Sequence, residues 1–237
     1  MKVQYKSSND LTSEKWKEEI YIMNKSTGKE AFEWLICILI ALLVVALIKT
    51  FVGFPTVVSG ASMDSTLLNK QRLWVSKIGI EINKYPERGD IITFEAPTDK
   101  YITKASADLD NPVAIYEEEQ KSFFSKFISS LSLMSETSYI KRVIGLPGDH
   151  VEIKNGIVFL NNQPLNEEYL DIGTITDAAQ GCYTNIVVPD GYVYVLGDNR
   201  EVSADSRRFG CVPIDKIEGK AVFRFWPLNK IGSLNKK

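Results

Sequence analysis

Histidine and cysteine, the side chains that most often bind transition metals, are scarce in this sequence of 237 residues. There is one histidine, His150, and none of the three cysteines belongs to a CxxC pair. Structural zinc sites use four such ligands at short spacings. The composition therefore predicts no metal site.

An excess of positive charge is also lacking. The 28 lysines and arginines are balanced by 30 aspartates and glutamates, for a net charge of −2. Nucleic-acid-binding domains usually carry a basic stripe, so we expect no nucleic-acid partner. The hydrophobic content of 44% is sufficient for a packed core, which excludes a disordered chain.

The few cysteines leave one possible disulfide. Cys37 lies in an apolar run, so only Cys182 and Cys211 could pair, and then only in an oxidising compartment. Two separate thiols fit the sequence equally well. Both alternatives stay open.

One apolar run lies near the N-terminus, where the fifteen residues 34–48 contain no charged side chain. With its flanks, residues 31–52, it reaches the roughly 20 residues that cross a bilayer as a helix. We expect an uncleaved transmembrane anchor in contact with membrane lipid. The alternatives are a cleaved signal peptide and a buried core helix, but no A-x-A cleavage pattern follows and no face of the run is polar.

Residues 1–30 form a mixed-charge tail, in which we expect a short amphipathic helix around Leu11–Met23. Four lysines lie in residues 15–30, and few basic residues directly follow the apolar run. Basic residues accumulate on the cytoplasmic side of membrane spans. The sequence therefore predicts a single-pass protein of the cell membrane with a cytoplasmic N-terminus and an extracytoplasmic domain, residues 53–237.

Short segments rich in β-branched residues, separated by Gly, Pro, Asn and Asp, follow the anchor. They predict a mainly β domain, with antiparallel sheets coiled into a partly closed barrel. Asn155-Gly156 predicts a tight hairpin turn, because both residues tolerate positive φ. The expected strands are Thr56–Ser59, Arg72–Lys77, Asp90–Glu95, Tyr139–Ile144, Val151–Lys154, Ile157–Leu160, Gly191–Leu196 and Lys220–Trp226.

An insertion at about residues 96–138 interrupts this rhythm. Between Phe123 and Met134 its apolar residues recur at helical spacing, which predicts a helix with one apolar face. This helix could pack on the core of its own domain. It could also lie on the membrane surface or bind a partner.

The segment SGASMDSTL, residues 59–67, places Ser62 just beyond the anchor. A serine hydroxyl becomes a nucleophile only when a base removes its proton. His150 begins a strand whose alternate residues appear exposed, which makes it a weak candidate. We interpret Ser62 as a nucleophile that needs another base.

Lys141 is a second candidate base, because the residues around it in YIKRVIGLPGD, residues 139–149, are largely apolar. Desolvation can lower a lysine pKa from about 10.4 toward 7 or 8. The alternative is an edge-strand lysine that prevents aggregation. A further segment, GDNREVSADSRRFG, residues 197–210, contains many side chains that could pair with one another, which indicates a network that positions other groups.

Four segments in order, SGASMDSTL, RGDIITF (residues 88–94), YIKRVIGLPGD and GDNREVSADSRRFG, resemble the motifs of type I signal peptidases, peptidase family S26, in their compact Gram-positive form. The resemblance extends from about Pro55 to Pro227. It implies the signal-peptidase-like β fold and a membrane-bound serine endopeptidase that cleaves signal peptides from exported preproteins. It implies no cofactor.

The resemblance also implies a Ser/Lys dyad, with Ser62 as nucleophile and Lys141 as general base through an acyl-enzyme. Ser203 would hydrogen-bond to the lysine amine and orient it. The Ser62 N–H would donate to the oxyanion. Gly60 occupies the position from which a side chain supplies the second donor in this family, and glycine has no such side chain.

Further roles follow from the same resemblance. Two ion pairs would brace the site, Arg142 with Asp198 and Asp205 with Arg207. Shallow apolar pockets would take small side chains at the −1 and −3 positions of an extended signal peptide that pairs with the edge near residues 57–59. The residues that would line these pockets are Val58, Met63, Leu67, Tyr139 and Ile140.

Two features depart from the family pattern. Ser65 replaces a proline beside the nucleophile, and the insertion at 96–138 is longer than in compact members. These departures favour a member dedicated to particular substrates such as pilins, or a non-proteolytic factor for pilus assembly. A self-cleaving repressor-like protein shares the Ser/Lys chemistry, but this chain has an anchor and no DNA-binding pattern.

Overall fold

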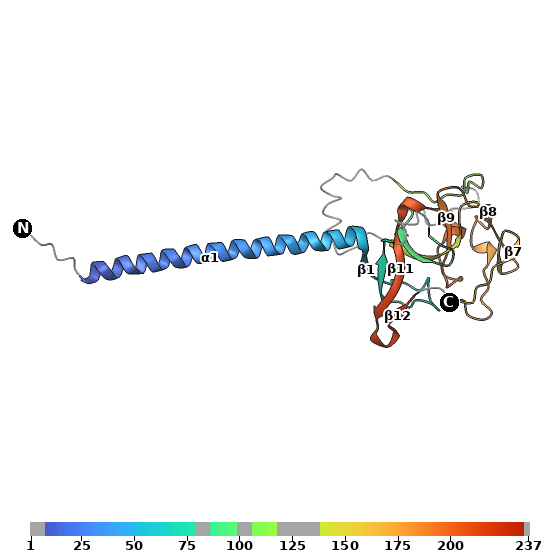
Figure 1. The fold of residues 1–237 in the computed structure, drawn as a ribbon. Helices are drawn as coiled ribbons and strands as arrows, with labels where there is room; N and C mark the ends of the chain where they lie inside the picture. Colours follow the sequence, from blue (N-terminus) through green and yellow to red (C-terminus); the bar gives the residue numbers. More distant parts are fainter. Residues whose placement is uncertain (1–7, 79–85, 99–105, 118–137, 235–237) are drawn as a thin grey trace, which may run out of the picture. The chain divides into compact units, whose positions relative to one another are not determined.

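The computed structural model describes residues 8–78, 86–98, 106–117 and 138–234. The chain divides into two compact units, Met1–Leu47 and Ile48–Lys237. Figure 1 shows a long helix in the first unit and β-sheets in the second.

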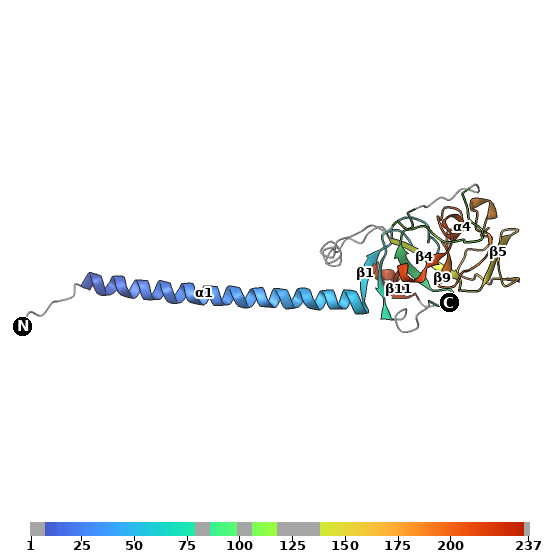
Figure 2. The same cartoon turned by 90° about the horizontal axis from the view of Figure 1, so that it is seen from above.

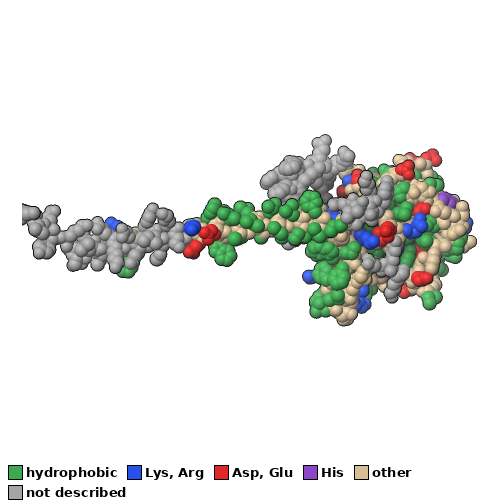
Figure 3. Space-filling model, in the orientation of Figure 1, with side chains coloured by type: hydrophobic (Ala, Val, Ile, Leu, Met, Phe, Trp, Pro, Cys, Tyr) green, Lys and Arg blue, Asp and Glu red, His purple; other side chains and the backbone are tan. Residues whose placement is uncertain are grey.

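The first unit is the helix α1 (Ser8–Leu47), and the π-helical turn η1 (Ile48–Val52) begins the second. The short helix expected around Leu11–Met23 is not separate, because it forms the first half of α1. Within the described residues, one helical stretch of 24 residues, Lys29–Val52, is long and apolar enough to cross a membrane. At 1.5 Å per residue it is about 36 Å long, against roughly 30 Å for a bilayer core. Its exposed apolar side chains are visible in Figure 3.

The second unit is built from two antiparallel sheets, as the sequence predicted, and their described pairings leave the larger one open at β1 and β10. The larger sheet has the order β1-β2-β11-β3-β4-β9-β10, with β12 beside β11, and the smaller has the order β7-β6-β5-β8. In Figure 2, β4 and β9 lie side by side and β5 lies apart from them. The strands are β1 (Gly53–Val57), β2 (Arg72–Ser76), β3 (Ile91–Glu95), β4 (Ser138–Gly145), β5 (His150–Lys154), β6 (Ile157–Leu160), β7 (Gln163–Pro164), β8 (Asn185–Val187), β9 (Tyr192–Leu196), β10 (Val212–Pro213), β11 (Ile217–Trp226) and β12 (Gly232–Ser233). The short helical segments are η2 (Ala178–Gln180), α4 (Ser206–Phe209), η3 (Ile214–Lys216) and η4 (Leu228–Lys230).

Each predicted strand has a counterpart, but the first begins earlier than expected. The prediction of Thr56–Ser59 excluded Pro55, whereas β1 includes it opposite Trp74. Proline is tolerated here because β1 is an edge strand, where its missing N–H costs no second ladder bond. The strands β7, β8, β10 and β12 were missed because two or three residues cannot show a period of two. The Asn155-Gly156 hairpin is confirmed, with φ of 52° and 79°.

Three apolar clusters fill the second unit. One of them joins the segment around Ser62 to the larger sheet, because Met63 and Leu67 pack with Leu73 and Ile91 at exposed fractions of 3% or less. A second cluster packs Phe94, Val143 and Phe209 around the opposite part of β3 and β4. The segment that carries Ser62 is therefore held by its own apolar side chains.

The described part of the insertion packs against the core of its own domain. Ala114 is buried in the second cluster, Val113 forms a β-bridge with Cys211, and the Tyr116 hydroxyl donates to the Glu95 carbonyl. The helix expected between Phe123 and Met134 lies outside the described residues.

The cysteine alternatives are resolved in favour of separate thiols. Neither Cys182 nor Cys211 is joined in a disulfide, and Cys211 is buried. Burial raises the pKa of the Cys211 thiol, so that residue behaves as part of the apolar core.

Candidate functional site

Ser62 lies at the start of a compact turn that backbone hydrogen bonds hold. The N–H groups of Thr66 and Leu67 donate to the Met63 carbonyl at 3.1 and 2.8 Å. Ser65, which lies between Met63 and Thr66, has φ of 87°, which a proline ring, fixed near −65°, cannot adopt. The proline of the family pattern would therefore require a different backbone conformation at this position.

Gly60 is selected by backbone conformation, because its φ is 91° and a Cβ there would meet no heavy atom within 4 Å. Its N–H donates to Asn69 Oδ1 at 3.3 Å. Within the described part of the chain, the Ser62 N–H has no acceptor, so it can donate a hydrogen bond to an oxygen atom of a bound substrate. Sequence reasoning missed Asn69, which no motif marks.

Lys141 and Ser62 meet directly. The Lys141 Nζ donates to the Ser62 Oγ at 2.7 Å, although 79 positions separate the two residues in the chain. Lys141 is 3% exposed, and its Nζ lies 5.1 Å from the centre of the Tyr139 ring. Once the amine is neutral, the Ser62 hydroxyl can give its proton to Lys141 Nζ across the same short contact.

Burial lowers the pKa of Lys141 to about 8, even though the nearby carboxylates of Asp205 and Asp198 act to raise it. An amine with this pKa is about 10% neutral at pH 7, whereas an ordinary lysine is neutral in well under 0.1% of molecules. The site therefore holds an amine that can accept a proton near neutral pH.

Arg142 follows Lys141, and all three nitrogens of its guanidinium donate hydrogen bonds. It forms a two-pronged ion pair with Asp198, at 2.9 and 2.6 Å, and donates to the Gly89 carbonyl and to Thr66 Oγ1 at 2.9 and 3.3 Å. Its guanidinium carbon lies 3.9 Å from the centre of the Tyr169 ring. Arg142 thus connects the strand that carries Lys141 to the turn that carries Ser62.

Asp205 and Arg207 form a second ion pair, at 2.8 Å, with both side chains fully buried. Burial alone would raise the pKa of Asp205, but the Arg207 guanidinium and the Gly197 N–H outweigh it and hold the pKa below its ordinary value. A carboxylate kept ionised in this way is a stable acceptor for the loop that surrounds it.

Ser203 does not make the hydrogen bond to the lysine amine that the resemblance implied. Its hydroxyl is fully buried and has no partner at hydrogen-bonding geometry among the described residues. It lies close enough to Asp205 to help lower the pKa of that carboxyl.

Gly197 and Asn199 attach this loop to the nucleophile; the sequence placed both in the segment GDNREVSADSRRFG but gave neither a role of its own. A Cβ on Gly197 would stand 2.4 Å from the Ser62 carbonyl oxygen and 2.2 Å from Ser203 Oγ, so only glycine fits. The Asn199 N–H donates to the same Ser62 carbonyl at 3.1 Å. A glycine directly after an apolar strand was the only available signal.

The residues expected to form apolar pockets are partly core residues. Val58, Met63 and Leu67 are buried, and Ile140 packs against them at intermediate exposure. Tyr139 packs on the other side, with its ring centroid 6.1 Å from that of Phe94. Val58, Met63 and Leu67 therefore belong to the core, whereas Tyr139 and Ile140 are only partly buried.

On one side of β4, β9 pairs only with Arg142, Val143 and Gly145, so Ile140 and Lys141 have no strand beside them there within the described chain. β1 likewise pairs only with β2. An extended peptide could hydrogen-bond to either edge.

His150 lies in the smaller sheet, where its Nε2 contacts Asn185 Oδ1 at 2.7 Å. It makes no contact with Ser62. Among the described residues, no group of three or more His, Cys, Asp or Glu side chains could hold a metal ion.

Comparison with known proteins gives a consistent result. Residues 31–226 match the family described as Signal peptidase, peptidase S26. The chain is 32% identical over 215 residues to Signal peptidase IB of Staphylococcus aureus, covering 85% of this chain and 93% of the relative. It is 35% identical over 197 residues to Probable signal peptidase I-1 of Synechocystis sp., covering 83% of both. The crystal structure of a signal peptidase I from Enterococcus faecalis shares 26% identity and covers 57% of this chain and 96% of that chain, with a TM-score of 0.37. The family assignment rests on the sequence matches.

The buried Asp205–Arg207 pair predicts a large loss of stability for Asp205→Asn. Removing one partner leaves the Arg207 charge buried without compensation, which typically costs about 3–5 kcal/mol. Because the folded-state pKa of Asp205 is lowered, its contribution is present above the unfolded pKa and is lost as the pH falls through the folded pKa. Chemical denaturation in detergent micelles, followed by tryptophan fluorescence, measures both effects.

The matched control is Glu152→Gln, which removes one partner of the more exposed Lys154–Glu152 pair. Such pairs contribute about 0–1 kcal/mol. A loss for Asp205→Asn no larger than that of this control would contradict the account of the buried pair.

Proposed function

The chain belongs to the signal peptidase family, peptidase S26, and cleaves signal peptides, and from that premise we propose that Ser62 and Lys141 perform the cleavage. Ser62 is the nucleophile and Lys141 is the general base. The observation that carries the proposal is the 2.7 Å contact between a serine hydroxyl and a buried lysine whose pKa is lowered to about 8.

In the first half of the reaction, neutral Lys141 takes the proton from the Ser62 hydroxyl as Oγ attacks the scissile carbonyl carbon. The tetrahedral oxyanion accepts a hydrogen bond from the Ser62 N–H, and one such donor typically contributes about 3 kcal/mol. The Lys141 ammonium then gives its proton to the departing amine. The signal peptide remains bound as an ester of Ser62.

In the second half, Lys141 takes a proton from water, and the resulting hydroxide attacks the ester. The tetrahedral intermediate collapses, Ser62 recovers its proton from Lys141, and the signal peptide leaves with a new carboxyl terminus. The chemistry uses only side chains and backbone of this chain and water.

The supporting residues keep this pair in place. Arg142 and Asp198 brace β4 against the Ser62 turn, and Asp205 and Arg207 brace the loop from Gly197 onward. Ser203 fills the space beside Gly197 and helps to hold the pKa of Asp205 low. Gly60 gives the approach to Ser62 its positive φ and leaves the oxyanion position open.

The substrate is the signal-peptide region of a preprotein, bound as an extended strand along the edge of β4 at Ile140 and Lys141 and near residues 57–59. Small side chains at its −1 and −3 positions face the surface of Val58, Met63, Leu67, Tyr139 and Ile140. Because Val58, Met63 and Leu67 are nearly fully buried, little room is left beside them for a large side chain.

The domain organisation and topology form part of the proposal. Residues 1–30 are a cytoplasmic tail, residues 31–52 are the single-pass anchor in the cell membrane, and residues 53–237 are the extracytoplasmic peptidase domain with the insertion at 96–138. The 24-residue apolar helical stretch supports the anchor, and the lysines before it support the cytoplasmic N-terminus.

A narrower proposal concerns the preprotein itself. The left-handed Ser65 and the long insertion distinguish this chain from the family pattern and favour a member dedicated to particular substrates such as pilins. Parallel assays with a pilin precursor and a general secreted preprotein, using one enzyme preparation, should show a higher kcat/KM for the pilin. Equal values would contradict a preference for pilins.

Pilus assembly that survives Ser62→Ala but fails without residues 96–138 would favour a non-proteolytic assembly role.

Two substitutions test the dyad. Ser62→Ala removes the nucleophile and should lower kcat by about 10⁴-fold or more. Lys141→Met removes the base but keeps an apolar side chain of similar length, and should cost at least about 10²–10⁴-fold. The measurement is cleavage of a preprotein by the full chain in detergent micelles.

Lys154→Met serves as the control, because it removes a lysine from the hairpin of the smaller sheet and should retain the rate of the unaltered protein. The dyad would be wrong if Ser62→Ala and Lys141→Met both retained the rate of this control.

A further inference from the structure

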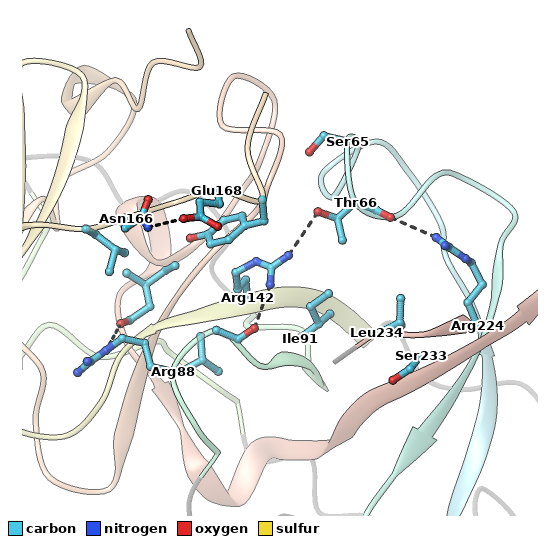
Figure 4. A pocket seen from close by; sticks show the side chains of 15 residues that line it. Ser65, Thr66, Arg88, Ile91, Arg142, Asn166, Glu168, Arg224, Ser233 and Leu234 are labelled. Carbon is cyan, nitrogen blue, oxygen red and sulfur yellow. Dashed lines mark hydrogen bonds between the residues drawn. The ribbon is translucent and has the colours of Figure 1, made fainter. Parts of the chain in front are cut away.

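A groove of about 700 Å³ lies beside the dyad and includes neither Ser62 nor Lys141. Figure 4 shows Arg142 and Thr66 near its middle, with Arg88 toward one end and Arg224 toward the other. Its volume falls within the roughly 300–1,000 Å³ that is usual for ligand pockets. The mechanism above makes no use of this space.

The order of residues along β4 places the groove on one side of the scissile bond. Tyr139 and Ile140 precede Lys141 and belong to the surface proposed for the signal-peptide half of the substrate. Arg142 and Ile144 follow Lys141 and line the groove. The half of the substrate that follows the scissile bond therefore leaves Ser62 on the groove side.

The substrate cannot continue straight along β4 beyond Lys141. From Arg142 onward β9 occupies that edge of the strand, and the Gly197–Asn199 segment contacts the Ser62 carbonyl. The mature half of the preprotein must therefore turn out of the sheet. Ser65 and Thr66, three and four positions after Ser62, form a wall of the groove that it then meets.

Two of the three arginines in the groove are already neutralised. Arg142 pairs with Asp198, and Arg88 pairs with Asp149, each at 2.6 Å. These guanidiniums stabilise the walls and leave little net charge for a ligand.

Arg224 is different, because no carboxylate of the described chain lies within ion-pair distance of it. Its guanidinium is only partly buried and donates to neutral acceptors: the carbonyls of Lys230 and Thr66, and the Gln71 side chain. Because these acceptors are neutral, no carboxylate balances the positive charge of the guanidinium, and its Nη2 donates to no acceptor among the described residues. Such a group is suited to binding the carboxylate of a substrate.

The opposite wall of the groove carries a negative charge. Glu168 is exposed there, and its partner is the neutral amide of Asn166 at 2.8 Å. Figure 4 places Glu168 and Arg224 on separate walls. The groove is therefore polarised, and an acidic group is attracted specifically toward Arg224.

We propose that this groove binds the first residues of the mature protein, on the far side of the cleaved bond, and that Arg224 gives the enzyme a preference for an acidic side chain among them. The inference rests on the proposed function, because it takes Ser62 as the point of cleavage.

The test is a series of peptide substrates that carry Glu or the isosteric Gln at each of the second to sixth positions after the cleaved bond. The full chain in detergent micelles should cleave the Glu peptide about two- to fivefold faster by kcat/KM at one or two adjacent positions, as expected for a partly exposed ion pair. The ratio should fall toward one at high salt. Lys at the same positions should give a ratio to Gln below one.

Arg224→Gln should bring the Glu/Gln ratio to about one, whereas Arg224→Lys should retain a ratio above one. Because the ratio compares two substrates with the same enzyme, a general loss of activity in either variant cancels. Lys154→Gln removes the same charge from the smaller sheet and should leave the ratio unchanged. It controls for the net charge of the protein.

A ratio of one at every position in the unaltered protein would overturn the proposal, and so would an unchanged ratio in Arg224→Gln. A separate result would contradict the proposed dyad, namely cleavage of these peptides by Ser62→Ala. Even then, the Glu/Gln ratio would still measure the effect of Arg224 on substrate preference.

Discussion

The removal of one lysine amine from water is the constraint on which the active site depends. Lys141 is 3% exposed, and desolvation lowers its pKa to about 8 because the charged form loses its hydration. An exposed lysine would bind its proton too tightly to act as a base near neutral pH. The tight packing of β4, the Ser62 turn and the loop after β9 is therefore a requirement of the proposed chemistry.

Charge balance around the amine is the second part of the same constraint. Asp198 and Asp205 both act to raise the pKa of Lys141, in opposition to burial. Each is paired with an arginine, which limits this effect and holds a loop in place. The two ion pairs thus allow carboxylates to brace the site while the amine still loses its proton. In the neighbouring groove, Arg224 has no such carboxylate, and that difference makes it available to substrate.

The sequence predicted much of this arrangement, and the failures have physical causes. Strands with a clear period of two were found, whereas strands of two or three residues were not, and Pro55 concealed the start of an edge strand. The motif resemblance pointed to Ser62 and Lys141. The roles of Gly197, Asn199 and Arg224 were missed because they lie in contacts made across the fold, to the Ser62 and Thr66 carbonyls, which no local pattern encodes. The resemblance implied that the Ser203 hydroxyl orients the lysine amine, but that hydroxyl makes no hydrogen bond among the described residues.

The ionisation of Lys141 tests the central claim most directly. NMR titration of the full chain in micelles, with lysines labelled with ¹³C at the ε carbon and the signal assigned by its loss in Lys141→Met, would measure the pKa of this one amine. The account predicts a value of about 8. A value near 10.5, the ordinary value for lysine, would show that the amine is not desolvated and would contradict a role for Lys141 as the general base.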